Sequence, residues 1–238
     1  MNRIHKGFQY NGVTLRTLPA NAVPATLTAT LAQMQVIGKR RPFPLLPHLP
    51  PRLFCDYIDT LPLWERELIQ DVQFHQNVFS FVATIISATE ANQLWAYVTS
   101  DGSAPNFTGT FGWSSKMSNR QPLATNNGPA PGYRTSSYRA EAYGILSFLI
   151  LIRHACLFTS QPLPTRLKPH TDSKSVTDKV TEMLTWPYYF TNAPMESDWD
   201  VLQAIVTELK RFNNPPPLIH VKGHQDNQMA YNQLYQPN

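Results

Sequence analysis

The segment from about Tyr138 to Leu157 constrains the fold most, because its side chains are apolar on nearly every side. A helix with this pattern has no polar face to turn toward water, so it has to be buried. Its strongest apolar run, Ile145 to Ile152, includes Ser147 and is shorter than the roughly 20 residues that span a bilayer. We therefore expect a core helix packed against a sheet, and no membrane anchor.

The composition is typical of an ordinary soluble protein, with 42% hydrophobic and 15% charged residues in a chain of 238. A formal net charge of +4 permits an anionic partner without requiring one. The first residues lack an apolar stretch of signal-peptide length. Cys55 and Cys156 are far apart, and neither has a Cys or His at zinc-like spacing. We expect reduced thiols without a disulfide partner, in the cytoplasm or nucleus.

Proline recurs through the first 60 residues, most densely in RPFPLLPHLPPR, just after a basic trio at 39–41. Proline removes a backbone donor and fixes φ, which disfavours long helices and central strands. Within this region only Ala25–Ile37 has the spacing of a short amphipathic helix. We expect residues 1–60 to form an irregular arm or connection fragment, followed by a helical connector at 61–90.

From Leu61 onward, apolar residues recur with helical or strand periods. Helices are expected at 61–72 after Pro62, at 138–157 with a cap at Ser136 or Ser137, at 175–184, and at 197–212 with a cap at Ser197 or Asp198. Strands are expected at 94–103, 109–117, 166–172 and 217–224. Phe74–Ser87 fits either state, and 121–134 is a Pro-, Asn- and Gly-rich connection in which one further strand is optional. The order predicts an α/β domain over 91–238.

Three carboxylates stand at the edges of these elements, in the order Asp101, Glu141 and Asp172, and His224 closes the last strand. Glu141 is the one acid in the apolar helix, where an unpaired carboxylate is costly unless a cation or donor compensates. Convergent carboxylates are what a pair of Mg²⁺ ions requires, because Mg²⁺ takes oxygen ligands and clamps the attacking and leaving oxygens of a phosphodiester.

Each of these residues has a purely structural alternative. Asp101 fits a turn residue before Gly102, Asp172 fits an N-cap of the next helix, and Glu141 fits a salt bridge to Arg139 or Arg153. His224 also fits a hydrogen-bonded histidine at a strand end.

Five motifs in chain order, DGS, FGW, RAEAYG, TDSKS and VKGH, resemble ribonuclease H type 1, and specifically the domain attached to reverse transcriptases of retroelements. The resemblance covers about residue 93 to residue 238. It implies an RNase H-like mixed five-stranded sheet flanked by helices. It also implies an endonuclease that hydrolyses the RNA strand of RNA–DNA hybrids with two Mg²⁺ ions, for which Mn²⁺ can substitute. The protein is then a monomer or part of a larger retrotransposon polyprotein.

The resemblance assigns roles to four residues. Asp101 corresponds to the ligand that bridges both metal ions, and Glu141 to a ligand of one ion. Asp172 corresponds to a ligand of the other ion that also helps to place the attacking water. His224 corresponds to a mobile histidine that assists product departure.

One departure from the family concerns a fourth carboxylate, which the resemblance places on a helix after the histidine. The chain ends at Asn238, and Asp226 comes only two residues after His224, too close to lie on that helix. We expect Asp226 to be a loop residue, with a substitute ligand as the alternative, in a domain that lacks its final helix.

Substrate contacts are expected around these acids, because A-form minor grooves are recognised through 2′-hydroxyls and the backbone. The candidates are Ser103, Asn106 and Thr108 for sugars and phosphates, and Arg139, Lys174, Lys179 and Lys222 for phosphates. Two other functions compete. An integrase or transposase resembles the order Asp, Asp, Glu, which this chain does not follow. A catalytically inactive retroelement remnant that binds nucleic acid is the remaining alternative.

Overall fold

The computed structural model describes residues 52–90, 94–132, 135–186 and 197–223, together with the backbone of two short strands near the N-terminus. The chain divides into two compact units, Met1–Pro50 and Pro51–Asn238. In the first unit, β1 (Phe8–Tyr10) pairs antiparallel with β2 (Val13–Leu15). The helix expected at Ala25–Ile37 lies outside the described residues.

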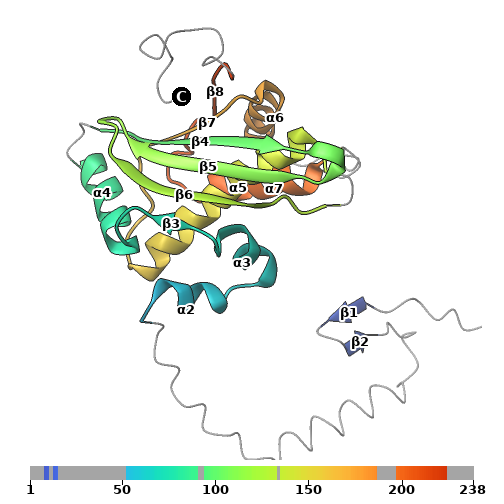
Figure 1. Ribbon diagram of the computed structural model, residues 1–238, viewed down its shortest axis with the longest axis horizontal. Coiled ribbons are helices and arrows are strands. Elements are labelled where there is room, and N and C mark those ends of the chain that lie inside the picture. Colours follow the sequence, from blue (N-terminus) through green and yellow to red (C-terminus); the bar gives the residue numbers. More distant parts are fainter. Residues whose placement is uncertain are drawn as a thin grey trace, which may run out of the picture. The chain divides into compact units, whose positions relative to one another are not determined.

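The second unit contains a six-stranded mixed sheet in the order β3-β6-β5-β4-β7-β8 (Figure 1). Its strands are β3 (Gln73–Phe74), β4 (Ala96–Ser103), β5 (Thr110–Met117), β6 (Pro122–Pro129), β7 (Leu167–Thr171) and β8 (Ile219–His220). β3, β6, β5 and β4 pair antiparallel, whereas β7 runs parallel to β4 and β8 parallel to β7. The predicted mixed α/β sheet is confirmed, with β3 as an additional edge strand.

Six helices complete the described part of this unit: α2 (Phe54–Asp59), α3 (Leu63–Ile69), α4 (Val78–Glu90), α5 (Ser137–Phe158), α6 (Lys174–Thr185) and α7 (Trp199–Leu209). The helix start at Ser136 is confirmed, because its Oγ accepts a hydrogen bond from the Arg139 amide at 3.1 Å. Asp198 occupies the N-cap position of α7, but its side chain makes no capping hydrogen bond.

The region 121–134 differs from the expected connection, because it contains the eight-residue strand β6. Pro122 and Pro129 are the two ends of this strand, where a missing amide donor interrupts little of the ladder. Between them Leu123, Ala124 and Asn126 are buried. The polar and Gly-rich composition concealed a strand whose partner, β5, supplies most of its pairing.

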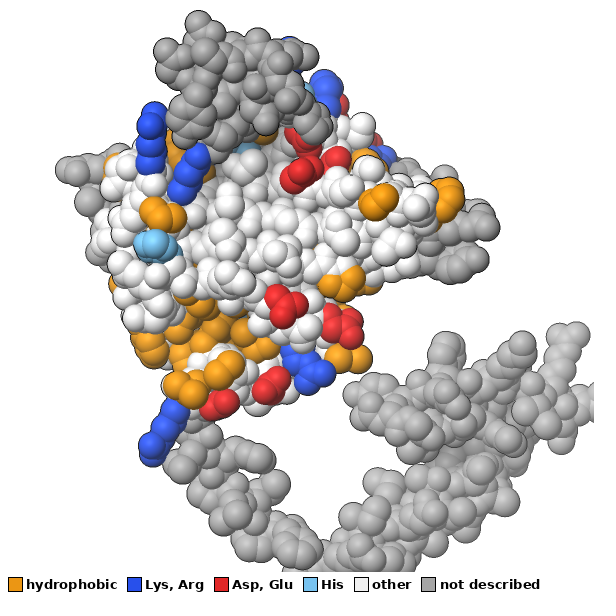
Figure 2. Space-filling model, in the orientation of Figure 1, with side chains coloured by type: hydrophobic (Ala, Val, Ile, Leu, Met, Phe, Trp, Pro, Cys, Tyr) orange, Lys and Arg blue, Asp and Glu red, His pale blue; other side chains and the backbone are white. Residues whose placement is uncertain are grey.

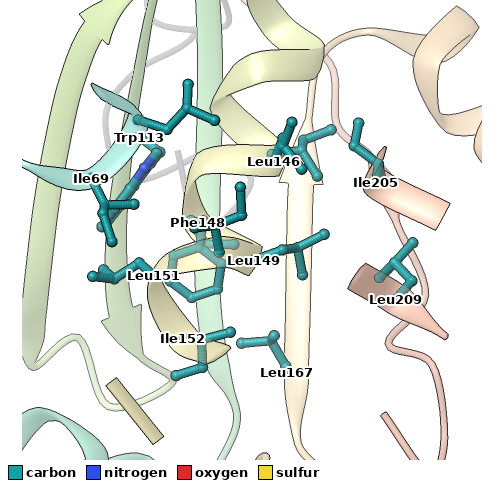
Figure 3. Close-up of a cluster of buried hydrophobic side chains, with 14 of the residues drawn as sticks. Ile69, Trp113, Leu146, Phe148, Leu149, Leu151, Ile152, Leu167, Ile205 and Leu209 are labelled. Atoms are coloured by element: carbon teal, nitrogen blue, oxygen red, sulfur yellow. The ribbon is translucent and has the colours of Figure 1, made fainter. Parts of the chain in front are cut away.

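Helix α5 forms the centre of the core, as its apolar sequence predicted. It is long and apolar enough to cross a membrane by length and composition, but 78% of its most apolar window is buried inside the protein. Figure 3 shows Phe148, Leu149 and Ile152 between the strands and the α7 residues Ile205 and Leu209. Trp113 of β5 meets the Phe148 ring edge-on, with centroids 5.2 Å apart. Both cysteines are free thiols, Cys55 exposed and Cys156 buried in α5.

A buried polar network fastens α3 to the sheet and to α5. Ser147 Oγ donates to the Leu68 carbonyl at 2.7 Å and accepts from Trp113 Nε1 at 2.9 Å. The amide of Asn126 on β6 donates to the same carbonyl at 2.7 Å and to Ser147 Oγ at 3.0 Å. Because buried polar groups are costly unless paired, these bonds specify one position for α3.

A second network joins α2 and α3 to α5 and α7. His154 lies between the Tyr57 hydroxyl at 2.8 Å and a Glu65 carboxylate oxygen at 2.6 Å. Arg153 pairs with Glu65 at 2.9 Å and with Glu208 at 2.8 Å. Burial raises the pKa of Glu65, but the hydrogen bond from His154 and the charge of Arg153 outweigh it and hold the pKa below its usual value.

The structure therefore groups the chain differently from the boundaries drawn at residues 60 and 90. Helices α2 and α3 belong to the compact unit that begins at Pro51, because they form hydrogen bonds with α5 and the sheet and pack their apolar side chains into the same core. The local sequence pattern separated this region from the rest of the domain, because the hydrogen-bond partners of the region lie more than 50 residues further along the chain.

We predict that a chain beginning at Pro51 keeps the cooperative urea unfolding of the full-length protein, whereas a chain beginning at Ala91 loses it. The shorter chain lacks the fully buried Leu68, Ile69, Val82 and Ile85. Each such side chain contributes about 1.5–3 kcal/mol, so the loss is comparable to a whole domain's stability of about 5–15 kcal/mol. Circular dichroism during urea titration is the measurement. A sharp transition in the shorter chain would contradict the prediction.

Candidate active site at the sheet edge

Asp101 and Asp172 are brought together by the pairing of two parallel strands. Ser100 of β4 stands opposite Thr171 of β7. The next residue of each strand is therefore an aspartate at the same edge of the sheet. Asp101 is exposed, and one of its oxygens accepts the Gly102 amide at 2.8 Å.

Glu141 reaches this edge because the first turn of α5 lies directly on Gly102. A Cβ atom at Gly102 would come 2.5 Å from the carbonyl carbon of Ala140 and even closer to the backbone nitrogen of Glu141. Such distances do not occur between real atoms, so only glycine fits here. One turn after Glu141, Gly144 makes a second close approach to β4. A Cβ atom added at Gly144 would lie only 3.0 Å from the Cβ atom of Ser100.

We predict that Gly102→Ala separates α5 from β4, lowers the free energy of unfolding by at least about 2 kcal/mol, and displaces Glu141. The matched control is Gly112→Ala on the neighbouring strand, where a Cβ would meet its nearest atom at 3.9 Å. Urea unfolding of both variants is the measurement. Equal stabilities would contradict the close approach.

Asp101 and Asp172 lie close enough to Glu141 to affect its pKa. The pKa of Glu141 is raised, chiefly by burial and also by the negative charges of Asp172 and Asp101, while a hydrogen bond from Ser173 opposes the rise. The structural alternative of a salt bridge is wrong, because Arg139 pairs with Asp198 and Asp200, and Arg153 pairs on α3 and α7.

Asp172 carries a buried oxygen, Oδ1, that has no hydrogen-bond partner among the residues that the structure describes. The N-cap position of α6 belongs to Ser173, so Asp172 does not cap that helix. Gly223, after β8, packs against this carboxylate so closely that a Cβ there would lie 2.5 Å from its Oδ2. An unpartnered buried oxygen of this kind requires an explanation.

A hard divalent cation suits these donors, since it would pair with Asp172 Oδ1 and neutralise the repulsion that raises the Glu141 pKa. Within the described ranges, however, no three His, Cys, Asp or Glu side chains are grouped closely enough to hold a metal ion. The residue types fit the cation, and their arrangement in this structure is more open than a closed coordination shell.

We predict that Glu141→Gln stabilises the fold at pH 7 in buffer containing EDTA. The folded-state pKa of Glu141 lies above its ordinary value of 4.5, so stability falls as pH rises through the unfolded pKa toward the folded one. Glutamine avoids this loss, and the gain disappears below about pH 4, where both states are protonated.

Thermal unfolding of the wild type and the variant at both pH values measures this difference. The exposed Glu182→Gln on α6 is the control and should give no such gain. A less stable Glu141→Gln protein at pH 7 would contradict the prediction.

A groove of roughly 610 Å³ opens beside Asp101. Its lining includes Ser103 and Thr110 of the β4–β5 hairpin, Asn127 of β6, and Asp71 just after α3. The structure thus places the predicted residue Ser103 next to Asp101. Asp71 and Asn127 are not among the site residues predicted from the sequence. Asp71 belongs to the segment expected to be a helical connector, and Asn127 belongs to the Pro-, Asn- and Gly-rich connection in which a strand was optional.

The other substrate candidates are distributed differently. Asn106 and Thr108 are exposed at the hairpin tip, and Asn106 has a left-handed backbone with φ 53°. Lys174 pairs with Asp178 on α6, Lys179 lies 5.1 Å from the centroid of the Trp186 ring, and Lys222 is exposed after β8. His224 and Asp226 lie outside the described residues.

Arg139, expected at a substrate phosphate, is engaged within the fold. Its guanidinium donates to Asp198 at 3.0 Å and to Asp200 at 2.7 Å. Its Nε donates to the Pro131 carbonyl at 2.8 Å. These bonds hold the start of α7 against α5, a role that local sequence could not reveal.

Neither a protein-family model nor a curated protein matches the sequence. Among solved structures, RNase H1 from the halophilic archaeon Halobacterium salinarum NRC-1 matches with 17% identity and a TM-score of 0.40, over 56% of this chain and 89% of that chain. LC11-RNase H1, isolated from compost and crystallised with an RNA/DNA hybrid, matches with 13% identity and a TM-score of 0.41, over 55% and 87%. The N-terminal RNase H domain of a Mycobacterium tuberculosis protein matches with 14% identity and a TM-score of 0.33, over 49% and 76%.

Proposed function

We propose that this protein is a metal-dependent endonuclease that hydrolyses the RNA strand of RNA–DNA hybrids, and that it derives from the reverse transcriptase polyprotein of a retrotransposon. The observation that carries the proposal is the convergence of Asp101, Glu141 and Asp172 at one sheet edge, with a buried oxygen of Asp172 unpartnered. The two arginines of α5, Arg139 and Arg153, pair with other acids, and a bound cation is a chemically consistent partner for the three carboxylates.

Asp101, Glu141 and Asp172 are the residues that would hold the metal ions. Two bound Mg²⁺ ions supply Lewis-acid stabilisation of the phosphodiester and lower the pKa of water. The protein contributes the positions of the ligands. The Gly102 amide restrains one oxygen of Asp101, and the hydrogen bond from Ser173 restrains Glu141.

The groove beside Asp101 is suited to a ribose-containing strand. Ser103, Thr110 and Asn127 present hydroxyl and amide groups along its lining, and 2′-hydroxyls distinguish RNA from DNA through such contacts. Asp71 in the same groove disfavours a phosphate at that position, because it adds a negative charge. We assign the sugar edge, rather than the phosphates, to this part of the groove.

Removal of one metal-binding carboxylate should abolish most cleavage while leaving the fold intact. We predict that Asp101→Asn and Asp172→Asn each reduce hybrid cleavage at least about 100-fold in Mg²⁺. The matched control is Asp56→Asn on α2, an exposed residue outside the site. The assay compares a labelled RNA–DNA hybrid, single-stranded RNA and duplex DNA in Mg²⁺, Mn²⁺ or EDTA. Cleavage by either site variant at the wild-type rate would remove that residue from the proposed site.

The second candidate is an inactive retroelement remnant that binds nucleic acid. It is favoured by the lack of a closed three-ligand cluster within the described ranges. The same assay separates the two functions, because a remnant binds the hybrid but does not cleave it in either metal.

In the active form, we assign His224 as the proton carrier and Asp226 as the substitute metal ligand.

A further inference from the structure

The two faces of strand β4 have different surroundings, because side chains alternate along a strand. Ala96, Val98 and Ser100 are buried on the face where Gly144 of α5 approaches the Cβ of Ser100. The intervening residues Trp95, Tyr97, Thr99 and Asp101 belong to the opposite face. Figure 1 shows α5 and α7 behind the strands and the other face of β4 and β5 turned to the viewer.

The register gathers basic and aromatic residues at one end of this second face. Tyr97 stands opposite Lys116 of β5 and opposite Lys168 of β7. Arg166 adjoins Trp95, since its carbonyl accepts the next amide, that of Ala96, at 3.1 Å. We call these five residues, Trp95, Tyr97, Lys116, Arg166 and Lys168, the basic end.

The aromatic rings hold two of the cations in place. Lys168 Nζ lies 4.1 Å from the centroid of the Trp95 ring and 5.9 Å from that of Tyr97. The Arg166 guanidinium carbon lies 5.2 Å from the Trp95 centroid. Cations at such distances are attracted by the ring quadrupole. The side chains are thereby restrained before any ligand arrives, which lowers the entropy cost of binding.

The cations of the basic end lie close enough to affect neighbouring titratable groups. The pKa of Lys116 is lowered, first by burial and then by the charge of Arg120. Burial and the charges of Lys168 and Lys116 lower the pKa of the neighbouring His170 to about 4. Burial is the main cause of both shifts, and the neighbouring positive charges add to it. A group of cations of this kind suits an anionic partner.

The same face ends in negative charge. Asp101 follows Trp95 by six residues on one side of β4, which corresponds to about 20 Å at about 3.3 Å per residue. In Figure 2, Lys and Arg side chains lie at the upper left of this face and Asp and Glu side chains lie further right, where a further Lys or Arg side chain stands beside them. The register thus aligns a cationic and an anionic end along β4.

We propose that the basic end binds the phosphate backbone of the nucleic-acid substrate. Along β4, this end lies about 13 Å from Asp101 at the level of Tyr97, Lys116 and Lys168 and about 20 Å from it at the level of Trp95 and Arg166. The inference rests on the proposed function for the identity of the substrate. A separation of about 13 to 20 Å corresponds to roughly four to six nucleotides at about 3.4 Å each. One end of the face anchors the polyanion through its charge, and the other end, with its cations bound, acts on a phosphodiester.

The first experiment measures binding of a labelled RNA–DNA hybrid in EDTA, across a salt series, by fluorescence anisotropy. Arg166→Gln/Lys168→Gln removes two phosphate contacts, so the slope of log affinity against log salt should fall by about 2. Wild-type and variant affinities then diverge roughly tenfold as salt drops from 200 to 50 mM. The control removes two charges elsewhere, with Arg52→Gln/Lys210→Gln, and should leave the slope close to that of the wild type.

The second experiment locates the contact. Neutral methylphosphonate linkages are placed about four to six nucleotides from a fixed cleavage position, on either side and on each strand. They should weaken binding to the wild type at one of these places and have no further effect on the Arg166→Gln/Lys168→Gln protein. Lys168→Arg keeps the charge and should keep the wild-type slope. If the double variant does not fold by circular dichroism, Lys116→Gln replaces it, with an expected slope change of about 1.

An unchanged slope in a folded variant, or no hybrid binding by the wild type in EDTA, would overturn the inference. Competition by polyglutamate as effective as that by nucleic acid would overturn the assignment of a nucleic-acid backbone. Binding that depends on Lys168, together with no cleavage in Mg²⁺ or Mn²⁺, would instead overturn the proposed nuclease function and leave the basic end as a docking surface.

Discussion

The close approach of helix α5 to strand β4 at Gly102 is the constraint on which the site depends. Because no side chain separates the two backbones there, the first turn of α5 starts at the same edge where β4 and β7 end. Glu141 consequently reaches Asp101 and Asp172 from the helix, although the three residues are 31 to 71 positions apart in sequence. The buried length of α5 then fixes this contact, since the rest of the helix has no other surface on which to pack.

The few polar groups of α5 determine which neighbours it accepts. Ser147, Arg153 and His154 all find partners on elements outside the helix. An all-apolar helix could slide or rotate by a turn at modest cost, whereas a paired polar group that loses its partner is costly when buried. The two networks therefore select one arrangement of α2, α3 and α7 around the core. They also make α2 and α3, which precede most of the sheet in sequence, part of the same domain.

Much of this architecture was predictable from local pattern. The length and burial of α5, its cap at Ser136, the strands β4, β5 and β7, and the end positions of Asp101 and Asp172 follow from periodicity and capping chemistry. β6 was harder, because its polar, Gly-rich sequence carries a weak strand signal and pairing with β5 decides its state.

The role of Arg139 and the packing of α3 were not predictable either. The sequence pattern predicts Arg139 at a substrate phosphate, but its guanidinium pairs with Asp198 and Asp200, which lie 59 and 61 positions further along the chain. The carbonyl of Leu68 meets side chains from β6 and α5. Such choices depend on which distant groups the fold brings near, and a local window contains no information about them.

The position of α3 in the chain has a consequence for synthesis on the ribosome. Leu68 and Ile69 are completely covered only when β6 and α5 exist, and α5 ends at Phe158. At roughly 5–20 residues per second, the nearly 90 residues between them take about 5 to 20 seconds to make. During that interval the strand β6 and the helix α5, which cover most of the apolar side of α3, have not been completed. The N-terminal helices must therefore wait for the strands made after them, and folding of this unit is completed late in translation.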